Sequence, residues 1–120
     1  MARYLLSVHT VDGESREPMT DEQMQDFMRR IGELEAEMNS NEVLVYSGRL
    51  AEPDAARVVR VEGGKTLTTD GPFAETKEQL GGVYIINSAD LDEALSWASK
   101  TSDCVGQPIE VRPFSASHGA

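Results

Sequence analysis

The chain has few of the residues that build cysteine-based centres or a large aromatic core. Cys104 is the only cysteine among 120 residues, so an intrachain disulfide and a cysteine-based zinc site are both excluded. Aromatic residues make up 6% of the sequence and hydrophobic residues 39%. A single domain with so modest a core commonly gains stability by burying further surface against a second subunit.

Basic charge is also scarce. The chain has 21 acidic and 11 basic residues, for a formal net charge of −10. Nucleic acids and anionic membrane surfaces both attract basic proteins, so neither is an expected partner. The sequence has no signal-peptide pattern and no apolar run of transmembrane length. We therefore expect a cytoplasmic location.

Histidine is equally rare, with His9 and His118 as the two occurrences. His118 lies in a predicted tail, whereas His9 lies at the end of a predicted strand. A partly buried, hydrogen-bonded His9 is one interpretation, and a proton-transfer role is the other. No serine has an evident histidine partner for nucleophilic catalysis, and no metal site or cofactor is expected.

Local patterns predict two helices, four main strands and an extra hairpin. A capping box formed by Thr20 and Gln23 begins the first helix, and Asp90 caps the second. The main strands are expected at residues 4–9, 43–47, 82–87 and 109–114. Strands at residues 57–61 and 65–69 are joined by the turn Glu62-Gly63-Gly64.

Apolar residues at helical spacing predict which helix faces enter the core. In the first helix these residues, with the methionines as core filler, are Met24, Phe27, Met28, Ile31, Leu34 and Met38. In the second helix the predicted core face consists of Leu91, Ala94, Leu95 and Ala98, with Trp97 at its flank.

The order strand, helix, strand, hairpin, strand, helix, strand predicts an α+β fold. This order of elements is typical of a ferredoxin-like antiparallel sheet with two helices on one face and, here, an extra β-hairpin. The domain covers residues 1–114, followed by a flexible tail at 115–120. In two strands, at 43–46 and 83–86, the side chains that point to either face of the sheet are apolar. Both sheet faces should therefore be buried. Because two helices cover only one face, we expect an isologous homodimer that packs sheet to sheet, with Tyr84 or Ile86 at the interface.

The densest polar chemistry lies in the run Asp70-Gly71-Pro72-Phe73-Ala74-Glu75-Thr76-Lys77-Glu78-Gln79. Asp-Gly and Pro72 are typical of a rigid turn, and Phe73 would then pin this turn onto the core. In the alternative interpretation the turn aims Asp70 into a cleft between two sheets, where it acts as a general acid or base. Gly81-Gly82, just after the run, is expected to allow close backbone approach.

Four further residues could hold an anionic ligand. The Thr76 hydroxyl and the Lys77 ammonium could together bind a carboxylate or enolate oxygen. Arg60 and Arg112 lie on predicted strands, where ion pairing with neighbouring glutamates competes with bidentate binding of an anionic substrate. Arg112 is the better candidate of the two.

These motifs resemble the DGPF branch of the YCII-related family over residues 3–114. The residues that carry the resemblance are the run at 70–79 with Gly48-Arg49-Leu50, Arg60, Gly81-Gly82-Val83-Tyr84, Asp90-Leu91-Asp92-Glu93-Ala94, Trp97-Ala98 and Ile109-Glu110-Val111-Arg112-Pro113. The resemblance implies a dimeric α+β barrel. Some relatives use a histidine near the first helix together with an aspartate, but this sequence reads Pro18-Met19-Thr20-Asp21 there. Proteins of this branch are often encoded beside, or fused to, alternative sigma factors.

The combined expectation is a homodimer that binds a small anionic or aromatic molecule in a cleft at the dimer sheets. Gly71, Pro72 and Phe73 would shape this cleft. Asp70 would act as acid or base and Lys77 or Arg112 would stabilise the anion, which gives cofactor-independent chemistry of the isomerase or lyase type. The alternative is a non-catalytic ligand-binding or regulatory module that acts with a sigma factor.

Overall fold

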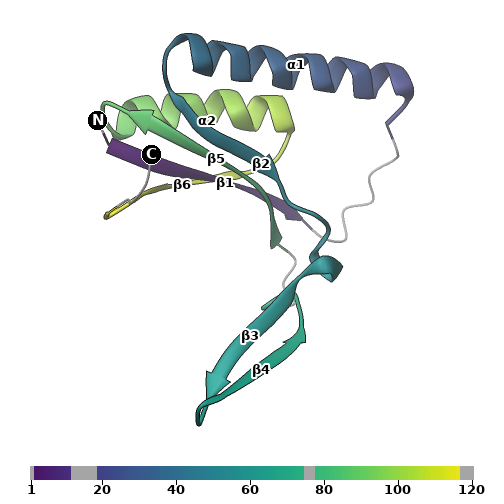
Figure 1. Cartoon of the computed structure of the whole chain (residues 1–120). Helices are drawn as coiled ribbons and strands as arrows, with labels where there is room; N and C mark the ends of the chain where they lie inside the picture. Colours follow the sequence, from purple (N-terminus) through teal and green to yellow (C-terminus); the bar gives the residue numbers. More distant parts are fainter. Residues whose placement is uncertain (1, 12–18, 75–77, 117–120) are drawn as a thin grey trace.

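A computed structural model of the chain describes residues 2–11, 19–74 and 78–116 and shows a mixed α+β fold (Figure 1). Its elements are β1 (Ala2–Val11), α1 (Asp21–Ser40), β2 (Leu44–Arg49), the 3-10 helix η1 (Pro53–Ala55), β3 (Arg57–Glu62), β4 (Lys65–Asp70), β5 (Glu78–Ser88), α2 (Leu91–Val105) and β6 (Ile109–Pro113). Four strands form a sheet in the order β2-β5-β1-β6, in which every neighbouring pair is antiparallel. The ferredoxin-like prediction is confirmed, and β3 and β4 form the expected extra hairpin.

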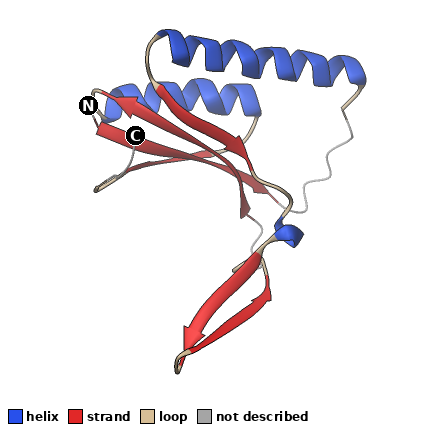
Figure 2. Ribbon diagram, viewed as in Figure 1, coloured by secondary structure: helices blue, strands red, loops and turns tan. Residues whose placement is uncertain are grey.

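Both helices lie on the same face of the four-stranded sheet, as Figure 2 shows. Tyr84 and Ile86 on β5 are buried toward these helices, with Ile86 fully inaccessible. Because side chains alternate along a strand, Val83 and Ile85 point to the opposite face and are only half-buried. Tyr84 and Ile86 therefore belong to the core of the chain, and the expectation that they face a second copy is wrong.

The opposite face of the sheet, called here the uncovered face, has no helix over it among the described residues (Figure 1). The strand register gives its apolar members as Leu5, Tyr46, Val83 and Ile85. The Tyr46 side chain is 60% exposed. Within one chain, the face under the helices is buried as predicted. The uncovered face is not.

The helix starts follow from capping, as predicted. The Thr20 hydroxyl accepts from the Gln23 backbone N–H at 3.1 Å, and the Gln23 side chain accepts from the Thr20 N–H at 3.0 Å. At α2 the Asp90 carboxylate accepts from the Glu93 N–H at 2.9 Å. These bonds satisfy backbone donors that have no partner inside the helix.

The apolar stripe of α1 enters the core only in its second half. Leu34 and Met38 are buried, whereas Met24 and Met28 are 45% and 60% exposed. The prediction that these two methionines fill the core is wrong. The physical reason is that the first half of α1 extends beyond the end of α2, where none of the described helices and strands covers it (Figure 1).

The predicted core face of α2 is confirmed for Ala94 and Ala98 and wrong for Leu91 and Leu95. Ala94, Ala98 and Trp97 are buried, but Leu91 and Leu95 are about half exposed, at 49% and 46%. The true core face continues through residues 101 and 104, a threonine and a cysteine, which a hydrophobicity pattern undervalues. Trp97 is therefore a core residue and not a flanking one.

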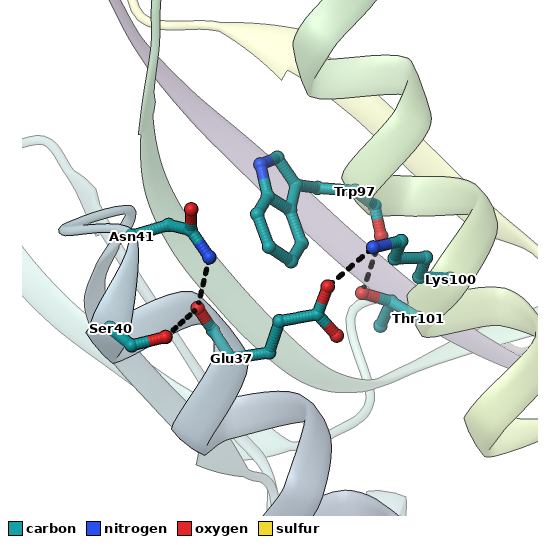
Figure 3. Close-up of polar contacts among 6 residues, drawn as sticks. All are labelled: Glu37, Ser40, Asn41, Trp97, Lys100 and Thr101. Carbon is teal, nitrogen blue, oxygen red and sulfur yellow. Dashed lines mark hydrogen bonds and ion pairs between the residues drawn. The ribbon is translucent and has the colours of Figure 1, made fainter.

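A polar clamp joins the two helices beside Trp97 (Figure 3). The Lys100 ammonium donates to the Glu37 carboxylate at 2.5 Å and lies 4.9 Å from the centroid of the Trp97 ring. The backbone carbonyl of Glu37 accepts from Ser40 Oγ at 3.1 Å and from Asn41 Nδ2 at 2.8 Å. The clamp therefore holds the end of α1 against α2, over the core.

The hairpin turns at two glycines and projects away from the helices (Figure 1). Gly63 and Gly64 both have positive φ, 57° and 77°, which is the geometry of a two-residue hairpin turn. The radius of gyration, 16.6 Å, exceeds the roughly 14 Å expected for a compact domain of this length. The difference is consistent with a hairpin that lies outside the packed body.

Burial gives Tyr84 a role in alkaline stability. Desolvation, reinforced by the charges of Glu35 and Cys104, raises the pKa of Tyr84 to about 12. In the unfolded chain the phenol titrates near pH 10, so above this pH the unfolded state loses its proton first. Stability present below pH 10 should fall by about 2 kcal/mol as pH rises to 12.

Urea unfolding followed by Trp97 fluorescence between pH 9 and pH 12 measures this loss. In Tyr84→Phe the part of the loss that this phenol causes should disappear. If the wild type and Tyr84→Phe lose the same free energy of unfolding across this range, groups other than Tyr84 cause the loss.

Candidate functional site

The turn after β4 closes the base of the hairpin. Its Gly71-Pro72 peptide bond is cis, and the Gly71 N–H donates to the Ala56 carbonyl at 2.9 Å. A Cβ added at Gly71 would lie 2.8 Å from the Cβ of Ala56, closer than real Cβ contacts allow. Glycine is therefore required here by the close approach of the two ends of the hairpin.

A cavity of about 550 Å³ lies at this hairpin base, a volume typical of small-molecule sites. Its lining is largely apolar and includes Leu50, Pro53, Val58, Pro72, Phe73 and Leu80. Arg57 and Gln79 add a guanidinium and a carboxamide. Two of the predicted ligand-binding residues, Pro72 and Phe73, therefore line the same cavity.

Two charged residues, Arg57 and Glu52, line this cavity, and sequence reasoning missed both; Arg57 is the basic one. Its Nη1 donates to the carbonyls of Asp54 and Ala56 at 3.2 and 2.8 Å, and its Nε lies 3.5 Å from Asp70 Oδ1. The signal was present in the hairpin register. A turn at residues 63 and 64 pairs 62 with 65, and counting back places Arg57 opposite Asp70.

Asp70 and Phe73 differ from their expected surroundings. The Asp70 side chain is 92% exposed, so within one chain the turn holds it at the rim of the hairpin base and not inside a cleft. Phe73 is 80% exposed and does not pin the turn onto the core. The turn is held instead by the Gly71 hydrogen bond and by Gln79 Nε2, which donates to the Ala74 carbonyl at 2.8 Å.

The other two predicted catalytic residues are Lys77 and His9. Lys77 lies outside the described residues, as does Thr76, which was predicted to bind the ligand. His9 is half-buried on β1 and pairs with Leu80 of β5. Because it lies four residues after Leu5 in the same strand, its side chain points to the uncovered face as that of Leu5 does. Its backbone N–H donates to the Pro108 carbonyl at 3.1 Å.

The two predicted arginines each pair with a nearby glutamate, as one interpretation anticipated. Arg60 Nη1 lies 4.0 Å from Glu62, and Arg112 Nη2 lies 2.7 Å from Glu110. Arg112 stands opposite Leu5, which places it on the uncovered face. Within one chain neither arginine joins the hairpin-base cavity.

The glycine pair in β5 allows close backbone approach, as predicted. A Cβ at Gly82 would lie 3.0 Å from the backbone oxygen of Gly48 on β2. The Leu50 N–H donates to the Gly81 carbonyl at 2.9 Å and so ties the segment after β2 to β5. The pair lies inside β5 and not ahead of it, since that strand begins at Glu78.

A larger cavity, of about 840 Å³, lies between the start of α1 and the end of α2. Cys104 lines it, and burial raises the pKa of this thiol, which disfavours the reactive thiolate. Across the described ranges, no group of three or more histidine, cysteine or acidic residues is placed to hold a metal ion. Neither described helix is long and apolar enough to cross a membrane.

The fold and its projecting hairpin define a ferredoxin-like α+β domain with a site candidate at the hairpin base. The family model of the YCII-related domain matches residues 3–114, and the chain belongs to the YCII-related family. It is similar to an uncharacterized protein of Rhizobium meliloti, with 49% identity over 69 residues. The match covers 55% of each sequence, so the chain spans about half the length of this curated relative.

Proposed function

We propose that the chain forms a homodimer through its uncovered face and binds a small organic acid with an apolar body at the hairpin base. The observation that carries the proposal is the open pocket itself, in which Arg57 lies at the edge of a mostly apolar lining. Guanidinium groups bind carboxylates in a bidentate manner, and apolar walls bind the body of the ligand.

Acid–base chemistry of the isomerase or lyase type, without a cofactor, is the reaction that we propose for this site. Asp70 at the rim would transfer the proton, and Arg57 would hold the substrate anion close to it. We keep Lys77 and Arg112 as proposed residues that stabilise the anion. Arg112 would do so from the uncovered face, where it lies. Membership of the DGPF branch and a cytoplasmic location are part of the same proposal.

Two matched arginines test the binding site. Arg57 and Arg60 lie on the same strand with similar side-chain exposure, 56% and 60%, but only Arg57 lines the cavity. In a thermal-shift and calorimetric screen of small carboxylic and phenolic acids, Arg57→Gln should weaken binding by about tenfold or more. Arg60→Gln should leave it unchanged.

Arg57→Lys keeps the charge and should restore part of the affinity, because only the bidentate geometry is lost. The melting temperature of each unliganded variant controls for damage to the hairpin base. Equal weakening by Arg57→Gln and Arg60→Gln would contradict the assignment of the cavity as the ligand site.

A second candidate is a regulatory module that binds another protein, for which the resemblance suggests an alternative sigma factor. The observation that favours it is the exposed apolar surface of α1, with Met24 and Met28 on its outer half. Exposed methionines are common at adaptable protein-binding surfaces. Capture of a sigma factor by the wild type, and its loss in Met24→Lys together with Met28→Lys, would support this function.

A further inference from the structure

The hairpin formed by β3 and β4 has exposed apolar side chains, and no helix or strand that the structure describes packs beneath them. Val59, Val61 and Leu67 are 63%, 66% and 45% exposed. Figure 1 shows the hairpin projecting from the end of the sheet, on the side away from the helices. An isolated two-stranded hairpin is at best marginally stable in water, so this one needs a further surface to pack on.

The two faces of the hairpin differ in chemistry. The register places Val59 opposite Thr68 and Val61 opposite Thr66, which gives one face four β-branched, uncharged side chains beyond the Arg57–Asp70 pair at its base. This face is called here the valine face. The opposite face carries Arg60, Glu62 and Lys65 among the apolar Val58 and Leu67. A valine face of this kind, left open, is a surface prone to association.

We propose that the valine face packs on a second copy of this chain, so that each hairpin clasps its partner beside the uncovered sheet face. The proposal rests on the homodimer of the proposed function. It adds a second contact between the two copies, besides the contact of their uncovered faces. The hairpin projects away from the helices, as the uncovered face does (Figure 1). Each of its six-residue strands spans roughly 20 Å, about twice the separation of two stacked sheets, so the hairpin can extend past a partner sheet.

Charge favours a second copy as the occupant. Within the hairpin, Arg57, Arg60 and Lys65 outnumber Glu62 and Asp70, which leaves one excess positive charge. The register places this excess on the face opposite the valine face, so it attracts an acidic partner at longer range and not within the contact itself. The whole chain has a net charge of −10, so two copies repel each other in general but attract where this hairpin meets the acidic remainder.

The clasp would also complete the ligand site. Val59 belongs both to the valine face and to the lining of the hairpin-base cavity. A partner packed on this face would therefore form part of the cavity wall. Ligand binding and dimerisation should then strengthen each other by the same factor.

Two neighbouring threonines give a matched test of the clasp. Thr68 lies on the valine face and Thr69 on the opposite face, and both are exposed. In sedimentation equilibrium, Thr68→Glu should raise the dimer dissociation constant by at least about tenfold, since it buries an unpaired charge. Thr69→Glu adds the same charge to a solvated face and should change the constant by less than about twofold.

Hydrogen exchange of the wild type gives a second readout, without any substitution. The amides of residues 57–70 should exchange more slowly above the dimer dissociation constant than below it. A dimer that both threonine variants weaken equally, with an unprotected hairpin, would overturn the clasp and leave the sheet-face dimer standing. A wild type that stays monomeric at tens of micromolar would overturn both.

Discussion

Replacing Ile86 by aspartate should unfold the chain, whereas the same change at its neighbour Ile85 should leave the fold intact and yield a monomer. Ile86 is fully inaccessible beneath the helices, so an aspartate there buries a charge without a partner. We expect a loss of at least about 4 kcal/mol, a large share of the stability of a small domain. Ile85 points to the uncovered face and is only half-buried within one chain.

For Ile85→Asp the stability of the monomer should therefore change little. The dimer dissociation constant should rise by about a hundredfold or more, because a dimer interface on this face would desolvate the new carboxylate. Circular dichroism measures the fold of both variants, and analytical ultracentrifugation measures their association. A folded, fully dimeric Ile85→Asp would place the dimer interface elsewhere on the chain.

Asp70→Asn should abolish turnover while leaving fold, dimer and ligand affinity intact. The substitution keeps the size of the side chain and removes the proton that an acid or base must transfer. Loss of such a group costs about a hundredfold or more in rate. Because the Asp70 side chain is 92% exposed, its substitution should leave the melting temperature almost unchanged.

The measurement is the rate with whichever acid the binding screen identifies, compared between Asp70→Asn and the wild type. Arg60→Gln serves as the control, since it changes another exposed residue of the same hairpin, one that does not line the cavity. If Asp70→Asn turns the acid over at the wild-type rate, Asp70 is only a turn residue. If neither protein forms product while both bind, the regulatory module becomes the better account.

Local signals predicted the elements well because short-range chemistry decides them. The Thr20 and Asp90 caps, the Gly63-Gly64 turn and the strand alternation each need only a few neighbouring residues. The helix faces were harder to predict. Met24 and Met28 have core spacing but lie where α1 extends past α2, and this overhang depends on the relative lengths and placement of the two helices.

The candidate site could be predicted in part. The run at 70–73 forms the turn at the base of the hairpin, and Pro72 and Phe73 line the cavity there. Arg57 was missed because its role depends on pairing across a hairpin, 13 residues away from Asp70 in sequence. The opposite parities of Ile85 and Ile86 could not be assigned from an unbroken apolar run, because only the placement of the helices tells one face from the other.

The uneven burial of the methionines in α1 has a chemical consequence. Met28 is 60% exposed and Met24 45%, whereas Met38 is fully inaccessible. A mild oxidant would convert the two outer thioethers to sulfoxides first, where the added polarity meets water and not the core. The oxidised protein would keep its fold and lose any partner held by those methionines, so the outer half of α1 could respond to oxidants independently of the hairpin base.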